Sequence, residues 1–164
     1  MKRLIILFLT ISISYSFSQG SKKSQISWLE LENAKILAKK YNQNILIYFY
    51  KDNCPYCDKM KATFDDPQVI NTINRNFLPV KINSRTKDTI YYMNQSYTNQ
   101  QPIDHGYTWR HDFYAEVASF NKNGTKQSTT PSIVIFDKKF DKIDLIPGNK
   151  PKELLLRILK RYLK

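Results

Sequence analysis

Glycine and cysteine are both scarce in this sequence. Its 164 residues include only four glycines and two cysteines. No Gly-x-Gly-x-x-Gly or Gly-x-x-x-x-Gly-Lys-Ser/Thr motif occurs, so dinucleotide and P-loop nucleotide chemistry are poor candidates. Two cysteines are also too few for a miniprotein that depends on several disulfides. We therefore expect neither nucleotide chemistry of these kinds nor a fold that depends on several disulfides.

Acidic residues are outnumbered, with 14 Asp and Glu against 26 Lys and Arg, a formal net charge of +12. The positive charges are spread over nearly every predicted element, whereas a nucleic-acid site would need a clustered stripe. We therefore expect a solvated basic surface and no nucleic-acid partner. Hydrophobic residues make up 41% of the chain, which is enough to close the core of one domain and disfavours intrinsic disorder.

The N-terminus has the three-part layout of a secretory signal peptide. Lys2 and Arg3 precede an apolar run over residues 4–13, and small residues at Ser16 and Ser18 predict cleavage after Ser18. The alternative is a membrane anchor, but a span needs about 20 apolar residues and this run is shorter. No cysteine lies near the predicted cleavage site, which excludes a lipoprotein anchor. We expect residues 1–18 to be removed, residues 19–26 to form a flexible tether, and the mature protein to be periplasmic or secreted without a stable membrane anchor.

The rest of the chain alternates between predicted helices and strands. Ser27 and Glu30 have the spacing of a capping box, which predicts a helix from Ser27 to Tyr41. The continuous apolar run 45–50 is typical of a strand covered on both faces by helices. Three further strands are predicted over residues 77–82, 132–136 and 140–146. Pro79 weakens the prediction of the first of these and indicates that it lies at an edge of the sheet. The other helices are predicted to begin at Pro55, Pro67 and Pro151.

Residues 84–128 form an insertion between two predicted strands. Residues 108–120 have helical spacing, and Asn123-Gly124 is a suitable stop for that helix. Residues 84–107 show no clear period. We expect the insertion to select a client protein and not to support the fold. Its tyrosines would form the contact surface: Tyr91, Tyr92, Tyr97 and Tyr107.

Both cysteines fall in one motif, Cys54-Pro55-Tyr56-Cys57, directly after the buried strand. Proline suits the first position of a helix, so Cys54 is expected at a helix N-terminus. Unpaired N–H groups and partial positive charge stabilise a thiolate there, and the thiolate is the reactive form. We expect Cys54 to be the nucleophile, exposed at the first turn, and Cys57, one turn inside, to close a disulfide onto it. Pro55 and Tyr56 would restrict the ring and help to set its redox poise.

Two other interpretations of the cysteine pair remain open. A static disulfide across so short a loop removes little chain entropy and stabilises weakly. Zinc or copper would need further ligands, and the remaining strong candidates are His105 and His111, in the least regular part of the chain. We favour redox chemistry by Cys54 and Cys57, with no metal site and only surface or structural roles for the two histidines.

These motifs together resemble the thioredoxin-like family, in particular its secreted single-domain members. A CxxC after a buried strand, combined with a proline before a later strand, is more specific than CxxC alone. The dipeptide Pro-Tyr is also typical of glutaredoxins. The resemblance covers most of the chain outside residues 84–128. The matching pieces are 28–41, 45–50, 54–57, 64–69, 77–82, Thr130-Pro131 and the terminal strand pair and helix.

The resemblance implies an α/β fold with a central mixed sheet and helices on both faces. It also implies that the Thr130–Pro131 bond is cis, beside the cysteines, and lines the substrate groove. Asn53 stands where thioredoxins carry a tryptophan, and Tyr48 stands where they carry a buried acid. Deprotonation of Cys57 therefore lacks its usual partner. Lys81 matches a family lysine and is a candidate for electrostatic support.

The function implied by the resemblance is thiol–disulfide exchange on exported proteins. The partners would be proteins with thiols or disulfides and an upstream electron donor or acceptor, with reduction favoured over oxidation. No cofactor is required, because the two cysteines hold the electrons. We expect a monomer. The alternative is a thioredoxin-fold binding or metal-handling module whose 84–128 insertion docks a specific partner.

Overall fold

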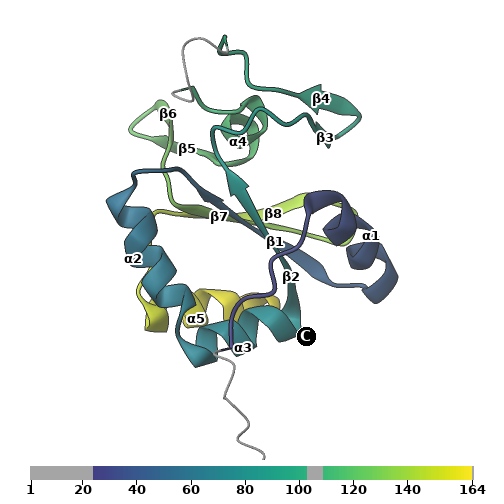
Figure 1. Cartoon of the computed structure of the whole chain (residues 1–164), viewed down its shortest axis with the longest axis vertical. Helices are drawn as coiled ribbons and strands as arrows, with labels where there is room; N and C mark the ends of the chain where they lie inside the picture. The colour runs from purple at the N-terminus through teal and green to yellow at the C-terminus, as the bar shows by residue number, and fades with distance from the viewer. Residues whose placement is uncertain (1–23, 103–108, 164) are drawn as a thin grey trace, which may run out of the picture.

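A computed structural model describes residues 24–102 and 109–163. Its centre is a mixed four-stranded sheet in the order β2-β1-β7-β8 (Figure 1). β1 runs parallel to β2 and antiparallel to β7, and β7 is antiparallel to β8. The expected α/β fold is confirmed. The strands are β1 (Asn44–Tyr50), β2 (Phe77–Asn83), β7 (Ser132–Phe136) and β8 (Lys142–Pro147).

Helices cover both faces of this sheet, which explains the unbroken apolar run in β1. Ile45, Ile47 and Phe49 pack in the core layer that α1 and α4 cover. Leu46 and Tyr48 point to the other layer, which α2, α3 and α5 cover. The helices are α1 (Leu31–Tyr41), α2 (Pro55–Phe64), α3 (Pro67–Asn76), α4 (Asp112–Val117) and α5 (Lys152–Leu159), the last followed by a 3₁₀ turn (Lys160–Tyr162).

The segment before α1 is extended, so the predicted capping box at Ser27 is wrong. α1 begins at Leu31, and Glu30 is its N-cap without a side-chain bond. The Leu29 N–H donates to the carbonyl of Pro79 at 2.8 Å, which pairs this segment with edge strand β2. Ile26, the last residue of the predicted tether, is buried. Pairing with a strand edge and burial outweigh the local helix signal here.

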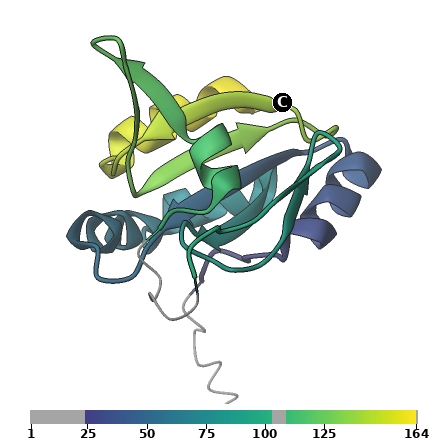
Figure 2. The same ribbon diagram turned by 90° about the horizontal axis from the view of Figure 1, so that it is seen from above.

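The insertion contains two hairpins with α4 between them. Each hairpin turns on two residues with positive φ, as a type I′ turn requires: Met93-Asn94 and Asn123-Gly124. The predicted helix 108–120 is therefore too long, because Asn123-Gly124 closes a hairpin and does not end a helix. Figure 2 shows the second hairpin projecting from the body of the domain. The strands are β3 (Ile90–Tyr92), β4 (Gln95–Tyr97), β5 (Ser119–Lys122) and β6 (Thr125–Ser128).

Part of the insertion belongs to the core, contrary to the expectation that it does not support the fold. Tyr92 is 8% exposed, and its ring centroid lies 5.5 Å from Phe113, 5.9 Å from Phe136 and 5.5 Å from Phe140. Phe113 itself is fully buried. Of the described tyrosines named as contact surface only Tyr91 is exposed, at 63%, while Tyr107 lies outside the described residues. Among the residues that the structure describes, no helix is long and apolar enough to cross a membrane.

Candidate redox site

The cysteines lie where β1 ends and α2 begins. Asn53 adopts φ 51°, a left-handed conformation that Asn tolerates better than most residues. Cys54 is the N-cap of α2 and Pro55 occupies its first turn, as the sequence predicts. Cys54 and Cys57 form a disulfide with their Cα atoms 5.1 Å apart. The pair is thus held at the N-terminus of a helix that packs on the sheet.

The backbone at this helix start favours negative charge on Cys54. The Cys57 N–H donates to the Cys54 Sγ at 3.2 Å, as an N-terminal amide does to a capping group. A thiolate at Cys54 would keep this donor and gain from the partial positive charge of the helix end. Exposure does not distinguish the pair, because Cys54 is 5% and Cys57 6% exposed. The expectation that Cys54 is the exposed member is wrong for the disulfide form.

The Thr130–Pro131 peptide bond is cis and lies beside Cys54. The Thr130 carbonyl is 3.8 Å from the Cys54 Sγ. The Pro131 carbonyl accepts the Gly148 N–H at 2.9 Å, which fixes this turn to the end of β8. The structure therefore brings Thr130 and Pro131 to the cysteine pair from far along the chain. Tyr56, in contrast, points to solvent and is 60% exposed.

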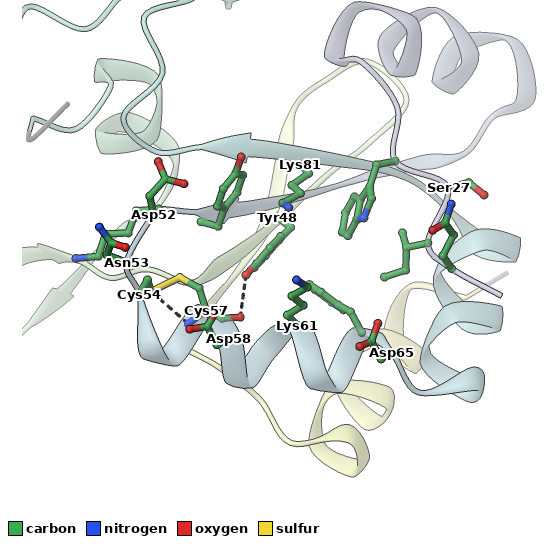
Figure 3. Close-up of a pocket in the computed structure, with 16 residues that line it drawn as sticks. Ser27, Tyr48, Asp52, Asn53, Cys54, Cys57, Asp58, Lys61, Asp65 and Lys81 are labelled. Carbon is green, nitrogen blue, oxygen red and sulfur yellow. Dashed lines mark hydrogen bonds between the residues drawn. A yellow bond between two sulfur atoms is a disulfide. The ribbon is translucent and has the colours of Figure 1, made fainter. Parts of the chain in front are cut away.

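Tyr48 lies beneath the pair on the α2 side of the sheet (Figure 3). It is buried, and its hydroxyl donates to the Cys57 carbonyl at 3.4 Å. Burial in the first place, and then the Asp58 carboxylate, raises the pKa of Tyr48 to about 12. This phenol keeps its proton at neutral pH. It orients the start of α2 and cannot serve as a base for Cys57.

A groove of about 720 Å³ opens beside the disulfide, and both cysteines contribute to its wall. Lys81 is exposed at its side, with its ammonium 4.4 Å from the centre of the Tyr50 ring. Sequence reasoning did not single out Asp58, Lys61 and Asp65, which line the same groove. Their spacing from Cys54 follows a helical period, and this signal could have revealed them.

His111 has a structural role. It is 1% exposed and caps α4, where its Nδ1 accepts the Phe113 N–H at 3.1 Å. Its Nε2 lies 2.8 Å from the Asp88 carbonyl, so Nε2 carries the proton of a neutral ring. Desolvation lowers the pKa of His111. His105 lies outside the described residues, and among the described ones no group of three or more His, Cys, Asp or Glu could hold a metal ion.

Comparison with known proteins identifies the family. A thioredoxin from Thermus thermophilus is similar to this chain at 18% identity and a TM-score of 0.57, over 84% of this chain and 86% of that one. An oxidoreductase described as DsbH is similar at 14% identity and a TM-score of 0.55, over 98% and 94%. No curated protein matches. A family model described as a thioredoxin-like domain matches residues 31–163, and the chain therefore belongs to the thioredoxin-like family.

Proposed function

We propose that this protein is an extracytoplasmic thiol–disulfide oxidoreductase that exchanges disulfides with exported proteins through Cys54 and Cys57. The observation that carries the proposal is the disulfide at the start of α2, with Cys54 as the N-cap. A helix N-terminus lowers the cost of a thiolate, and a CxxC pair can pass between dithiol and disulfide without a cofactor.

In the reducing direction, which we favour, the reaction has two exchange steps. The Cys54 thiolate attacks one sulfur of a client disulfide, a mixed disulfide forms, and the other client sulfur leaves as a thiolate that takes a proton. Cys57 then loses its proton and attacks the Cys54 sulfur. The Cys54–Cys57 bond forms as the second client thiolate leaves, so the client gains two electrons and two protons and the chain becomes oxidised.

The surroundings of the pair support these roles. The Cys57 N–H that bonds the Cys54 sulfur would stabilise Cys54 as the attacking thiolate. The Thr130 and Pro131 backbone beside Cys54 offers a surface for the client chain. Lys81 places one ammonium group at the side of the groove that both cysteines line. The client proteins and an upstream electron donor or acceptor are the partners of this proposal.

The proposed cellular location of the protein is inferred from the sequence of its N-terminus. Residues 1–18 have the layout of a signal peptide, so we propose a periplasmic or secreted protein. Mass spectrometry of exported protein should find a chain that begins near Gln19. An exported chain with an intact Met1 would contradict this part of the proposal.

A thiol-labelling titration tests the redox function. The protein is equilibrated in glutathione or dithiothreitol buffers of defined potential, and free thiols are labelled and resolved on a gel. We expect one two-electron transition that the Cys54→Ser variant lacks. In a second assay, the reduced protein should reduce a protein disulfide catalytically when a reductant regenerates it. A pair that titrates but never exchanges with a protein disulfide would refute the proposed function.

A further inference from the structure

The groove beside the disulfide is separate from the surface at Pro131. Cys54 and Cys57 both line it, whereas Thr130 and Pro131 do not. It extends from the disulfide to the extended segment before α1, where Ser27 and Trp28 form part of the wall (Figure 3). Its volume of about 720 Å³ is within the usual range of binding cavities. The pair is therefore bordered by a second concave surface that the redox steps do not use.

One wall of this groove is aromatic. The Trp28 ring lies 5.9 Å from Tyr48 and 5.6 Å from Phe64, and Tyr48 stacks on Tyr50 at 6.0 Å. Tyr48 and Phe64 are buried, so they support the wall from behind. Trp28 and Tyr50 are half-buried and present ring surface to the groove. Aromatic rings gain from offset or edge-to-face contacts with another ring beyond the burial of their area.

The charges around the groove favour neither a positively nor a negatively charged client. The side chains that line it include three lysines and three aspartates. Asp52 accepts a hydrogen bond from Asn83 at 2.9 Å, and Lys81 covers one face of Tyr50. Selectivity in this groove must then come from the aromatic wall. The charged residues are Lys51, Lys61, Lys81, Asp52, Asp58 and Asp65.

We propose that the groove is a specificity subsite for an aromatic side chain of the client polypeptide, close to the client's reacting cysteine. The inference rests on the proposed function. A client sulfur bonded to Cys54 lies at one end of the groove, because Cys54 lines it. Successive residues of an extended chain are about 3.3 Å apart, so client residues within a few positions of the reacting cysteine can enter the groove.

The test compares short peptides that each carry one cysteine as a mixed disulfide with 2-mercaptoethanol. The peptides have Phe or Ala at one of the three positions on either side of the cysteine. We expect the reduced protein to react with one of the Phe peptides about tenfold faster in kcat/KM than with its Ala counterpart, mainly through KM. Trp28→Ala should bring the two peptides within about twofold of each other, because the reaction with the Phe peptide slows more than the reaction with the Ala peptide.

Tyr41→Ala is the matched control, because Tyr41 is 59% exposed at the end of α1 and does not line the groove. It should keep the full preference for the Phe peptide. Tyr50→Leu is a second test of the wall, and it is decisive if Trp28→Ala fails to fold. It should also reduce the preference for the Phe peptide over the Ala peptide.

Three results would overturn the proposal, and they are distinct from failure of the proposed function. Equal reactivity of the Phe and Ala peptides with the unmodified protein would remove the subsite but not the redox activity. Loss of reactivity with both peptides to the same degree in Trp28→Ala would give Trp28 a purely structural role. A dimer in sedimentation that Trp28→Ala dissociates would place a second copy of the chain in the groove. If no peptide reacts at all, the proposed function itself fails.

Discussion

Replacing Tyr92 by alanine tests whether the insertion is part of the core. The Tyr92 ring is 8% exposed and contacts Phe113, Phe136 and Phe140, which come from α4, β7 and the turn before β8. Removing a buried aromatic ring leaves a cavity and typically costs about 3–5 kcal/mol. Because Tyr92 keeps some contact with solvent, we expect a loss of about 3 kcal/mol and a melting temperature roughly 10 °C lower.

The neighbouring Tyr91 supplies the control. It lies on the same short strand but is 63% exposed, so Tyr91→Ala should change the free energy of unfolding by less than about 0.5 kcal/mol. Urea unfolding followed by circular dichroism measures both variants, with the slope of the transition checked for two-state behaviour. If Tyr92→Ala were no more destabilising than Tyr91→Ala, the insertion would merely rest on the domain and our assignment of the core would be wrong.

Three further predictions concern the site and its surroundings. Cys57→Ser should trap mixed disulfides with client proteins on a non-reducing gel, whereas Cys54→Ser should not; equal trapping would reverse their roles. Tyr48→Phe should leave the pH profile of disulfide reduction unchanged between about pH 6 and 9, because a phenol with a pKa of about 12 stays protonated; loss of a kinetic pKa would show that Tyr48 exchanges a proton. Burial lowers the pKa of His111, so the folded state binds fewer protons than the unfolded state, and the stability due to neutral His111 is complete above about pH 6.5 and declines below it. The difference in urea midpoint between the unmodified protein and His111→Gln should therefore shrink from pH 7.5 to pH 5, and a constant difference would contradict this.

The sheet and the redox motif could be predicted from the sequence because their signals are local and agree with one another. Residues 45–50 are apolar without a break because both faces of β1 are covered, and Pro79 indicates the edge strand that it does occupy. The cysteine pair needs only the strand before it and the proline after Cys54 to be placed at a helix start. The cis bond at Pro131 and its place beside Cys54 follow only from the family resemblance, since no local pattern connects Pro131 with Cys54.

The errors arose where a tertiary contact competes with a local preference. Ser27 and Glu30 match a capping box, yet the Ser27 N–H bonds the Asn74 side chain at 2.9 Å and Leu29 pairs with β2. Asn123-Gly124 suits both a helix stop and a type I′ hairpin turn, and the pairing of β5 with β6 decides between them. A single sequence contains both alternatives, and only the partner strand shows which one forms.

The sequence carries no local signal that the insertion contributes to the core, and this contribution limits how the function of the insertion can be tested. In β3 the residues alternate inward and outward over only three positions, too few for a period to be recognised. One test would replace residues 86–106 by a short Gly/Ser linker. Loop-closure entropy changes by only about 0.6 kcal/mol per doubling of loop length, so it does not determine how this deletion affects stability. That deletion would remove Ile90 and Tyr92, both buried, and uncover the rings around Phe113. It should unfold or loosen the domain, so a loss of client binding by the deleted protein would not identify a recognition surface. Single changes at exposed positions such as Tyr91 and Met93, which are 63% and 70% exposed, can separate recognition from folding because they leave this core intact.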